Sequence, residues 1–270
     1  MASAEPVADV IAATRTRDIS RSLVSQRAFF GVSALLFVGS AALTIRWCTS
    51  MSAMGEMPMP EQTWLGAAAS FLGMWTVMMV AMMLPSLVPM LWRYREAVDG
   101  ETRRGRLTAL VGVGYFFVWT LVGVAAFPLS AALAGAVPVA AGVLVLIAGS
   151  LQFTAWKARH LACCREAPGR GTLRADASSA LRHGLRLGLH CVQCSAGLMT
   201  ILLVMGVMDL RAMALVAAAI TVERLAPAGE RIARAIGAIT LGAGLFLIVR
   251  AAGLACPLDM QVMACLLLGK

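Results

Sequence analysis

Cysteine and histidine are concentrated in one short part of the chain. All three histidines and four of the seven cysteines lie between residues 160 and 194 of this 270-residue sequence. Thiolates and imidazoles are the protein ligands that Cu(I) and zinc prefer. This window is therefore the first candidate for a metal site.

The spacing inside the window favours convergence on one point. His160 is followed three and four residues later by Cys163 and Cys164, so the three share one face of a helix. In the segment 190–194, His-Cys-x-x-Cys, His190 and Cys194 are four residues apart and Cys191 and Cys194 are three apart. The prediction is a soft metal ion, Cu(I) or zinc, bound by His160, Cys163, Cys164, His190, Cys191 and Cys194. Two alternatives stay open: cysteines that only pack among apolar residues, and a thiol-redox pair made by Cys191 and Cys194.

Methionine is the second unusual residue type, with 17 in the chain. Met54, Met57 and Met59 lie close together in a short segment between two apolar runs. Thioethers bind Cu(I) and do so in oxidising compartments, where free thiols do not persist. These residues are predicted to acquire copper outside the cell membrane, and a hydrophobic loop resting on lipid headgroups is the alternative.

A further group of methionines recurs every four residues. Met74, Met78 and Met82 form a stripe along one face of a predicted helix. The stripe predicts either a pathway for copper or adaptable packing between helices.

Membrane helices are the elements that must position these residues. Hydrophobic residues make up 60 % of the chain, charged residues 14 %, and the mean hydropathy is +0.81. A soluble domain carries about 25 % charge, so soluble enzymes and disordered chains are excluded. Runs of about 20 apolar residues are typical of membrane-spanning helices, and alternating β-barrel strands are absent from the pattern. The predicted fold class is all-α, a polytopic bundle of about seven transmembrane helices at 28–45, 64–92, 107–133, 136–156, 187–207, 210–228 and 232–255.

The distribution of charge predicts the orientation of this bundle. With a cytoplasmic N-terminus, 19 of the 23 Lys and Arg residues fall on the cytoplasmic side. The net charge of +9 is then explained by cytoplasmic loops, with no nucleic acid as partner. The expected organisation is a disordered cytoplasmic tail at 1–27, the helix bundle at 28–255, and an extracytoplasmic tail at 256–270. A bacterial cytoplasmic (inner) membrane is the expected location.

Glu223 is the one acid expected at membrane depth. Intramembrane acids are functional or paired. An interfacial ion pair with Arg224 is the simpler interpretation.

Three stretches resemble a known family: WTVMMVAMMLPSLVPML at 75–91, ARHLACCREAP at 158–168, and GLHCVQCSAGLMTILLVMGVMDLRAM at 188–213 followed by Glu223 and Arg224. The chain resembles the domain-of-unknown-function family of predicted metal-binding integral membrane proteins, some of which carry a copper-chaperone label. The resemblance implies a bundle of membrane helices and a metal role for the Cys-x-x-Cys segment. It also shows a departure, because a further Cys and a Trp often follow the second Cys in the family, where this chain has Ser195 and Ala196.

These observations favour a membrane protein that binds and delivers copper, with outer methionines and an inner Cys/His cluster. The expected partners are the lipid bilayer and either a copper enzyme or another membrane subunit. An accessory subunit of a membrane oxidoreductase and a thiol-redox membrane protein are the alternatives. The pattern contains no Ser/His/Asp set and no carboxylate pair typical of a hydrolase, so the chain is not expected to be an enzyme.

Overall fold

The computed structural model describes residues 5–53, 63–98, 101–134, 138–165 and 176–253. This part of the chain is helical throughout and contains no strand, which confirms the all-α class. The eight helices are α1 (Glu5–Ala53), α2 (Trp64–Ala97), α3 (Glu101–Ala134), α4 (Pro138–Leu151), α5 (Ala155–Arg165), α6 (Ala177–Met205), α7 (Leu210–Leu225) and α8 (Gly229–Ala251).

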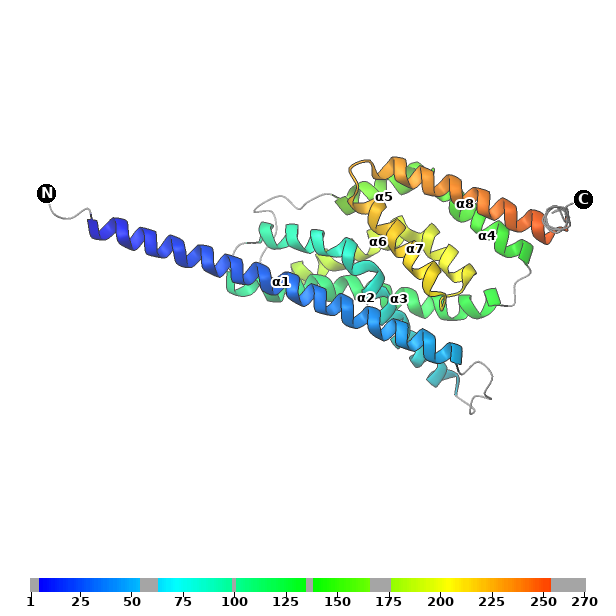
Figure 1. Ribbon diagram of the computed structural model, residues 1–270, viewed down its shortest axis with the longest axis horizontal. Helices are drawn as coiled ribbons and strands as arrows, with labels where there is room; N and C mark the ends of the chain where they lie inside the picture. The colour runs from blue at the N-terminus through cyan, green and yellow to red at the C-terminus, as the bar shows by residue number, and fades with distance from the viewer. Residues whose placement is uncertain (1–4, 54–62, 99–100, 135–137, 166–175, 254–270) are drawn as a thin grey trace, which may run out of the picture.

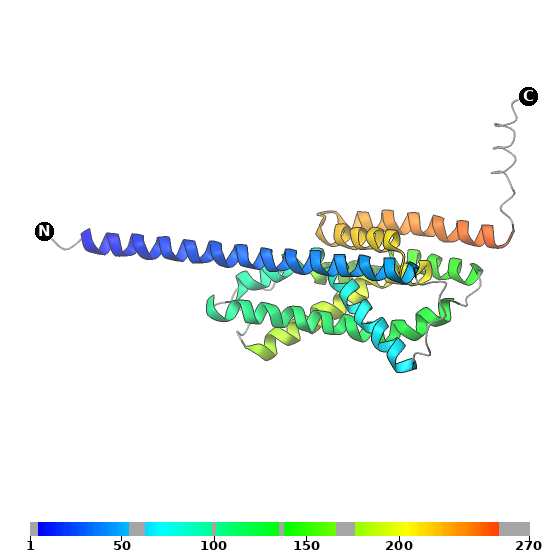
Figure 2. The same cartoon turned by 60° about the horizontal axis from the view of Figure 1, so that its bottom comes forward.

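The helices run along the long axis of the molecule as an elongated bundle (Figure 1). The long helix α1 lies along one side and extends beyond the others at its N-terminal end. α4, α5 and α8 lie on the opposite side, and α2, α3, α6 and α7 lie between. Figure 2, after rotation, shows the start of α1 and the end of α8 at opposite ends of the bundle.

Five helices are long and apolar enough to cross a membrane: α1 within Leu23–Ser50, α2, α3 within Arg103–Leu133, α6 and α8. A sixth candidate is the pair α4 and α5, which are bent by 65° at a short break. The predicted span at 210–228 corresponds to α7, whose 16 residues are too few for it to count among these candidates. The described chain therefore has five or six candidate spans, and the count of seven and the orientation of the ends stay predictions.

The first helix begins earlier than the first apolar run. α1 starts at Glu5, so most of the segment 1–27, which the sequence analysis treats as a disordered tail, belongs to this helix. The segment from residue 7 to the apolar run contains no Gly or Pro, so nothing in it ends a helix that the span has already nucleated. The outer tail at 256–270 lies outside the described residues.

Small residues bring α3 and α6 into close contact. Gly184 and Gly188, one turn apart on α6, face the backbone of Val111 and Tyr115 on α3. A Cβ atom at Gly184 would lie 2.3 Å from the Val111 carbonyl oxygen, and one at Gly188 would lie 3.0 Å from the Tyr115 carbonyl oxygen. Only glycine permits this approach, as in other membrane helix pairs with small residues four apart. The contact places the Tyr115 side chain against the next turn of α6, which carries Cys191.

The predicted helix at 136–156 is broken after Leu151. The amides of Gln152, Phe153 and Thr154 donate to carbonyls three residues earlier, which tightens the turn. The Thr154 hydroxyl accepts a hydrogen bond from the Lys157 amide at 3.3 Å and so caps the start of α5. This break turns α5 toward α6, where its cysteines meet those of the Cys-x-x-Cys segment.

Candidate thiol centre

Two cysteines from different helices meet at the contact between α5 and α6. The sulfur atoms of Cys164 and Cys194 are 3.8 Å apart, and both side chains are buried. The neighbouring Cys163 is exposed, because one further residue on a helix turns a side chain by about 100°. The structure therefore brings Cys164, and not Cys163, to the Cys-x-x-Cys segment.

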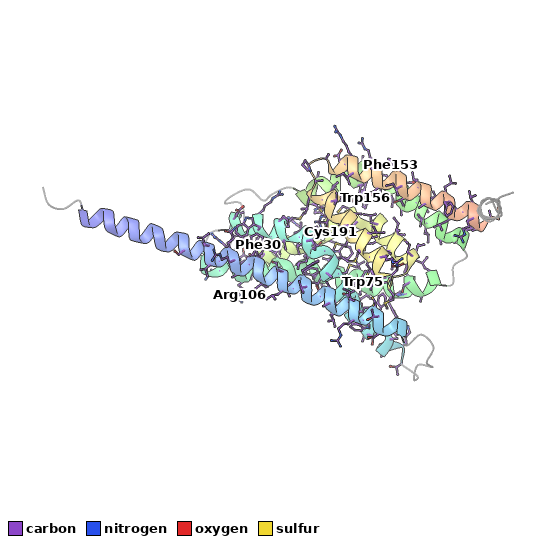
Figure 3. All side chains as sticks on the ribbon, in the orientation of Figure 1. Phe30, Trp75, Arg106, Phe153, Trp156 and Cys191 are labelled. Carbon is purple, nitrogen blue, oxygen red and sulfur yellow. The ribbon has the colours of Figure 1, made fainter. Side chains whose placement is uncertain are left out.

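Cys191 lies one turn before Cys194 on α6 and is completely buried. Its sulfur accepts hydrogen bonds from the Tyr115 hydroxyl at 2.9 Å and from Nη1 of Arg224 at 3.1 Å. The Cys194 thiol donates to the carbonyl oxygen of Cys191 at 3.3 Å. Three buried thiols from two helices thus lie close together, and one of them contacts the guanidinium group of Arg224. We call Cys164, Cys191, Cys194 and Arg224 the thiol centre (Cys191 is labelled in Figure 3).

Arg224 ties the thiol centre to the other core helices. It comes from α7 and is only 2 % exposed. Nη1 donates to the Ser86 hydroxyl of α2 at 3.0 Å and to the Tyr115 hydroxyl of α3 at 3.3 Å, and Nη2 lies 3.3 Å from the sulfur of Met90. A buried arginine held by hydroxyl and sulfur groups is a strong local positive charge inside the bundle.

The methionine stripe of α2 ends at this arginine. Met74, Met78 and Met82 are all buried, with exposures between 1 % and 4 %. The same four-residue spacing continues along α2 to Ser86 and Met90, the two α2 residues that contact Arg224. The thioethers therefore form a buried row along α2 that leads to the thiol centre. The spacing of the row is visible in the sequence, but its end point becomes clear only from the position of Arg224.

Two histidines form a second pair on the same helices. His160 precedes Cys164 by one turn and His190 precedes Cys194 by one turn, and their Nδ1 atoms are 3.3 Å apart. The ring of Trp156 packs edge-on against His160, with centroids 4.7 Å apart. The imidazoles contact each other, and one turn further along the same two helices the sulfur atoms of Cys164 and Cys194 meet. The imidazole pair and the sulfur pair are thus neighbouring contacts between α5 and α6.

The remaining histidine, His183, stacks on Tyr94 of α2 with ring centroids 5.2 Å apart. It belongs to the packing between α2 and α6.

Glu223 and Lys157 form a buried ion pair behind the thiol centre. The Lys157 ammonium is 2.7 Å from a carboxylate oxygen of Glu223, and their side chains are 5 % and 2 % exposed. Gln152 donates to the other carboxylate oxygen at 3.2 Å, and Lys157 also donates to the carbonyl oxygen of Cys194. Glu223 is therefore a buried acid paired with Lys157 of α5, whereas the sequence suggested Arg224 as its partner. The pair fixes the backbone of the Cys-x-x-Cys segment.

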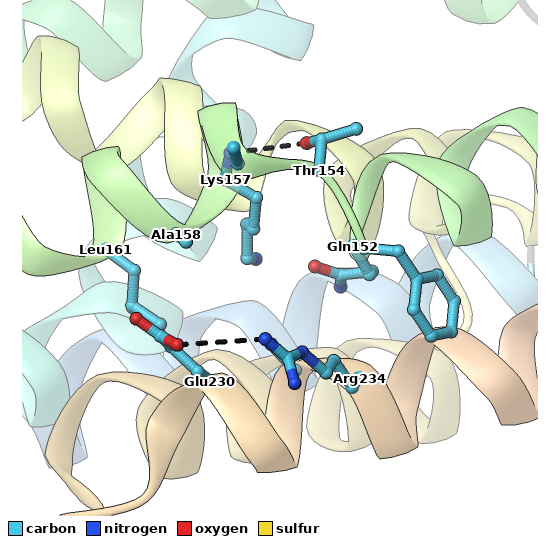
Figure 4. A pocket seen from close by; sticks show the side chains of 10 residues that line it. Gln152, Thr154, Lys157, Ala158, Leu161, Glu230 and Arg234 are labelled. Atoms are coloured by element: carbon cyan, nitrogen blue, oxygen red, sulfur yellow. Dashed lines mark hydrogen bonds and ion pairs between the residues drawn. The ribbon is translucent and has the colours of Figure 1, made fainter.

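Two cavities reach toward these buried groups. One, of about 240 Å³, opens at the break between α4 and α5 and is lined by Gln152, Lys157, Glu230 and Arg234 among others. Figure 4 shows Lys157 and Gln152 on one side of it and the Glu230–Arg234 pair of α8 on the other. The second, of about 220 Å³, is lined by Pro89, Met90, Arg93, Arg224, Leu225, Ala226 and Pro227. Arg224 faces this second cavity and also contacts Cys191, so the guanidinium group separates an opening from the thiols.

Most of the predicted metal ligands thus lie together, but not as one preformed shell. Within the described residues, no three or more His, Cys, Asp or Glu side chains are grouped so that they could hold a metal ion. The sulfur of Cys191 is directed at Tyr115 and Arg224. The outer methionines, Met54, Met57 and Met59, lie outside the described residues. Sequence reasoning missed Arg224, Tyr115 and Lys157 as neighbours of the thiols.

The fold and the buried sulfur groups together define an all-α bundle of apolar helices with a sulfur-rich core. Residues 72–247 match the model of the PpoB2 family, described as copper chaperone. Because this match covers more than half of the chain, the protein belongs to that family, which confirms the family resemblance seen in the sequence. Neither a curated protein nor a solved structure matches the chain.

Proposed function

We propose that this protein is an integral membrane copper chaperone that holds Cu(I) on buried thiolates and releases it to a partner protein. The observation that carries this proposal is the convergence of Cys164, Cys191 and Cys194 at the end of the buried methionine row. Thiolates and thioethers are the ligands that select Cu(I) over harder metals. Family membership supports copper as the cargo.

The distance between two of the thiols suits a bound ion. Two metal–thiolate bonds of about 2.3 Å that span 3.8 Å enclose an angle of roughly 110° at the metal. This angle leaves room for a third sulfur. Cys191 becomes that ligand when its sulfur turns from Tyr115 toward Cys194, one helical turn away. We expect the thiols, and not His160 and His190, to form the first shell, because the Cys164 and Cys194 sulfur atoms meet directly whereas the two imidazoles contact each other.

Arg224 supplies the charge that such a site needs. A Cu(I) ion with two thiolates carries a net charge of −1, and with three thiolates −2. A charge of this size is costly in the bundle interior unless an opposite charge lies beside it. The Arg224 guanidinium, 3.1 Å from the Cys191 sulfur, provides the opposite charge.

The route of copper through the protein follows from the same residues. We propose that Met54, Met57 and Met59 capture Cu(I) outside, that Met74, Met78 and Met82 pass it along α2, and that the thiol centre holds it. The cavity lined by Met90, Arg93 and Arg224 is the expected exit to a copper enzyme or another membrane subunit. The proposed location is a bacterial cytoplasmic membrane, with the N-terminus and the thiol centre on the cytoplasmic side.

Copper stoichiometry of purified protein tests this function. We expect about one Cu(I) per wild-type chain and a clear loss in each of Cys164→Ser, Cys191→Ser and Cys194→Ser. Cys163→Ser is the matched control, because this exposed cysteine adjoins Cys164 on the same helix and is expected to keep full copper content. Full copper content in all three buried-cysteine variants would contradict the proposal.

The contact between Cys164 and Cys194 favours one second candidate, a thiol-redox protein. The pair that could form a disulfide is then Cys164 with Cys194, since the Cys191 sulfur is held by Tyr115 and Arg224. Redox-dependent alkylation of these two thiols in protein that binds no copper would favour this candidate. Stable co-purification with an oxidoreductase, again without copper, would instead favour an accessory subunit.

A further inference from the structure

A large apolar groove separates α1 from α3. It encloses about 790 Å³ and is lined by apolar side chains of α1, α2 and α3, including Phe29, Leu36, Leu84, Val113 and Phe116. This volume lies in the range of specific ligand sites, about 300–1,000 Å³. The groove has no role in the copper route, because the thiol centre is formed by α5, α6 and α7.

Polar groups gather at one end of this groove. Ser25, Arg95, Gly105 and Thr108 line that end, whereas the rest of the lining is apolar apart from single hydroxyls. Arg95 donates through Nη2 to the hydroxyl and carbonyl oxygens of Ser25, and its guanidinium lies 5.3 Å from the centre of the Phe29 ring. Among the described residues, Arg95 has no carboxylate partner.

The length of the groove matches one leaflet of a bilayer. On α1 the lining runs from Ser25 to Leu36, about 17 Å along the helix. On α3 it runs from Gly105 to Thr120, about 22 Å. Half of a hydrocarbon core is about 15 Å thick, so an acyl chain that starts at the Arg95 end would follow the groove to the middle of the membrane.

The charge at the Arg95 end extends over neighbouring side chains. Arg104, half-buried on α3, donates to the carbonyl oxygen of Val98 and adds a second positive charge close to Arg95. Arg106 lies toward the same end of the bundle (Figure 3). Basic pockets between membrane helices at the cytoplasmic surface recognise anionic lipid headgroups.

We infer that this groove is a binding site for one anionic phospholipid, with its phosphate at Arg95 and an acyl chain between α1 and α3. The lipid would fill space that the protein leaves open and would place an anion beside Arg95. It would also link α1 to α3 within the bundle. This inference goes beyond copper handling and does not depend on it.

Two variants separate the headgroup from the acyl chain. Gly112 lines the groove, and a Cβ atom there meets nothing within 4 Å, so Gly112→Leu fills the groove without a clash. Gly242 on α8 is equally open and lies outside the groove, so Gly242→Leu is the matched control. Arg95→Gln removes the charge at the site, and Arg106→Gln removes an exposed arginine that does not line it.

Native mass spectrometry of protein released from nanodiscs counts the lipids that stay bound. With phosphatidylglycerol and phosphatidylcholine of identical chains, we expect one retained lipid and a preference for phosphatidylglycerol. Arg95→Gln should weaken that preference about fivefold, the effect of one arginine at a lipid surface, and Gly112→Leu should abolish retention of both lipids. Both controls should behave as wild type.

Three results would overturn the inference. The first is equal retention by Gly112→Leu and Gly242→Leu. The second is an unchanged preference for phosphatidylglycerol in Arg95→Gln. The third is a wild-type dimer without retained lipid, which would mean that a second copy of the chain covers the groove. Thermal unfolding of each variant in detergent identifies any that fails to fold, and Arg95→Lys, which keeps the charge, then replaces Arg95→Gln and should retain the preference.

Discussion

Adding one methyl group to Gly184 should separate α3 from α6 and disturb the thiol centre. The new Cβ atom would lie 2.3 Å from the Val111 carbonyl oxygen and within 3.0 Å of two further Val111 backbone atoms. Real Cβ contacts do not fall below 3.0 Å, so the helices must part by at least about 0.7 Å. Backbone atoms cannot relieve the clash by changing rotamer as a side chain can. Overpacking of this kind lowers the free energy of unfolding by about 1–3 kcal/mol.

The same shift acts on the site one and two turns along α6. Tyr115 follows Val111 by one turn of α3, and its hydroxyl is 2.9 Å from the Cys191 sulfur. A wider gap between α3 and α6 weakens this hydrogen bond and also the one between Tyr115 and Arg224. We therefore expect Gly184→Ala to lower the stability and also to speed alkylation of Cys191 in the folded protein.

Thermal unfolding in detergent provides the assay, with Gly242→Ala as control. Replacing Gly by Ala in a helix gains up to about 1 kcal/mol where space allows, and a Cβ atom at Gly242 meets nothing within 4 Å. Gly184→Ala should therefore unfold at a temperature lower than Gly242→Ala by about 2–12 °C, since 1 kcal/mol corresponds to about 2–4 °C at this chain length. Equal unfolding temperatures, or equal Cys191 alkylation rates, would refute the packing argument.

Three other predictions follow from the charges and the sulfur ligands. Glu223→Gln leaves the buried Lys157 ammonium unpaired and should cost about 3–5 kcal/mol, whereas adding Lys157→Met should recover most of this loss in chemical unfolding; no recovery would mean that the ion pair is not the cause. Copper affinity, measured by competition with a Cu(I) chelator, should fall as the pH is lowered, because thiols must lose their protons to bind the metal; a pH-independent affinity would speak against thiolate ligands. Replacing Met54, Met57 and Met59 together by Leu should reduce copper uptake at limiting external copper, and unchanged uptake would leave these residues a packing role only.

The helices of the bundle could be predicted from the apolar runs, but their interruptions could not. The runs at 64–92 and 107–133 each lie within an observed helix, and the run at 187–207 extends two residues beyond the end of α6 at Met205. The break after Leu151 could not be predicted from the sequence. Only three residues, one of them a buried glutamine, separate the two helices. Gln152 lies in this break, and its side chain donates a hydrogen bond to Glu223, which is distant in the sequence. α7 is shorter than its apolar run suggested, because Ala226 and Pro227 end it.

Part of the candidate site could be predicted from the sequence. Four-residue spacing puts His160 with Cys164 on one helix face and His190 with Cys194 on another, and in the structure these two faces are in contact. It could not show that Cys163 turns outward. Nor could it show that Arg224 supplies a positive charge to the thiols from a third helix. Contacts between helices depend on crossing and rotation, which a single sequence does not specify.

X-ray absorption at the copper edge of the Cu(I)-loaded protein tests the central claim most directly. We predict a first shell of two or three sulfur atoms at about 2.2–2.3 Å, the length of a metal–thiolate bond, in wild type and in Cys163→Ser. In Cys191→Ser the sulfur number should fall or the copper should be lost. A first shell of nitrogen or oxygen in wild type, or an unchanged sulfur shell in Cys164→Ser and Cys194→Ser, would contradict the proposal that buried thiolates hold the copper.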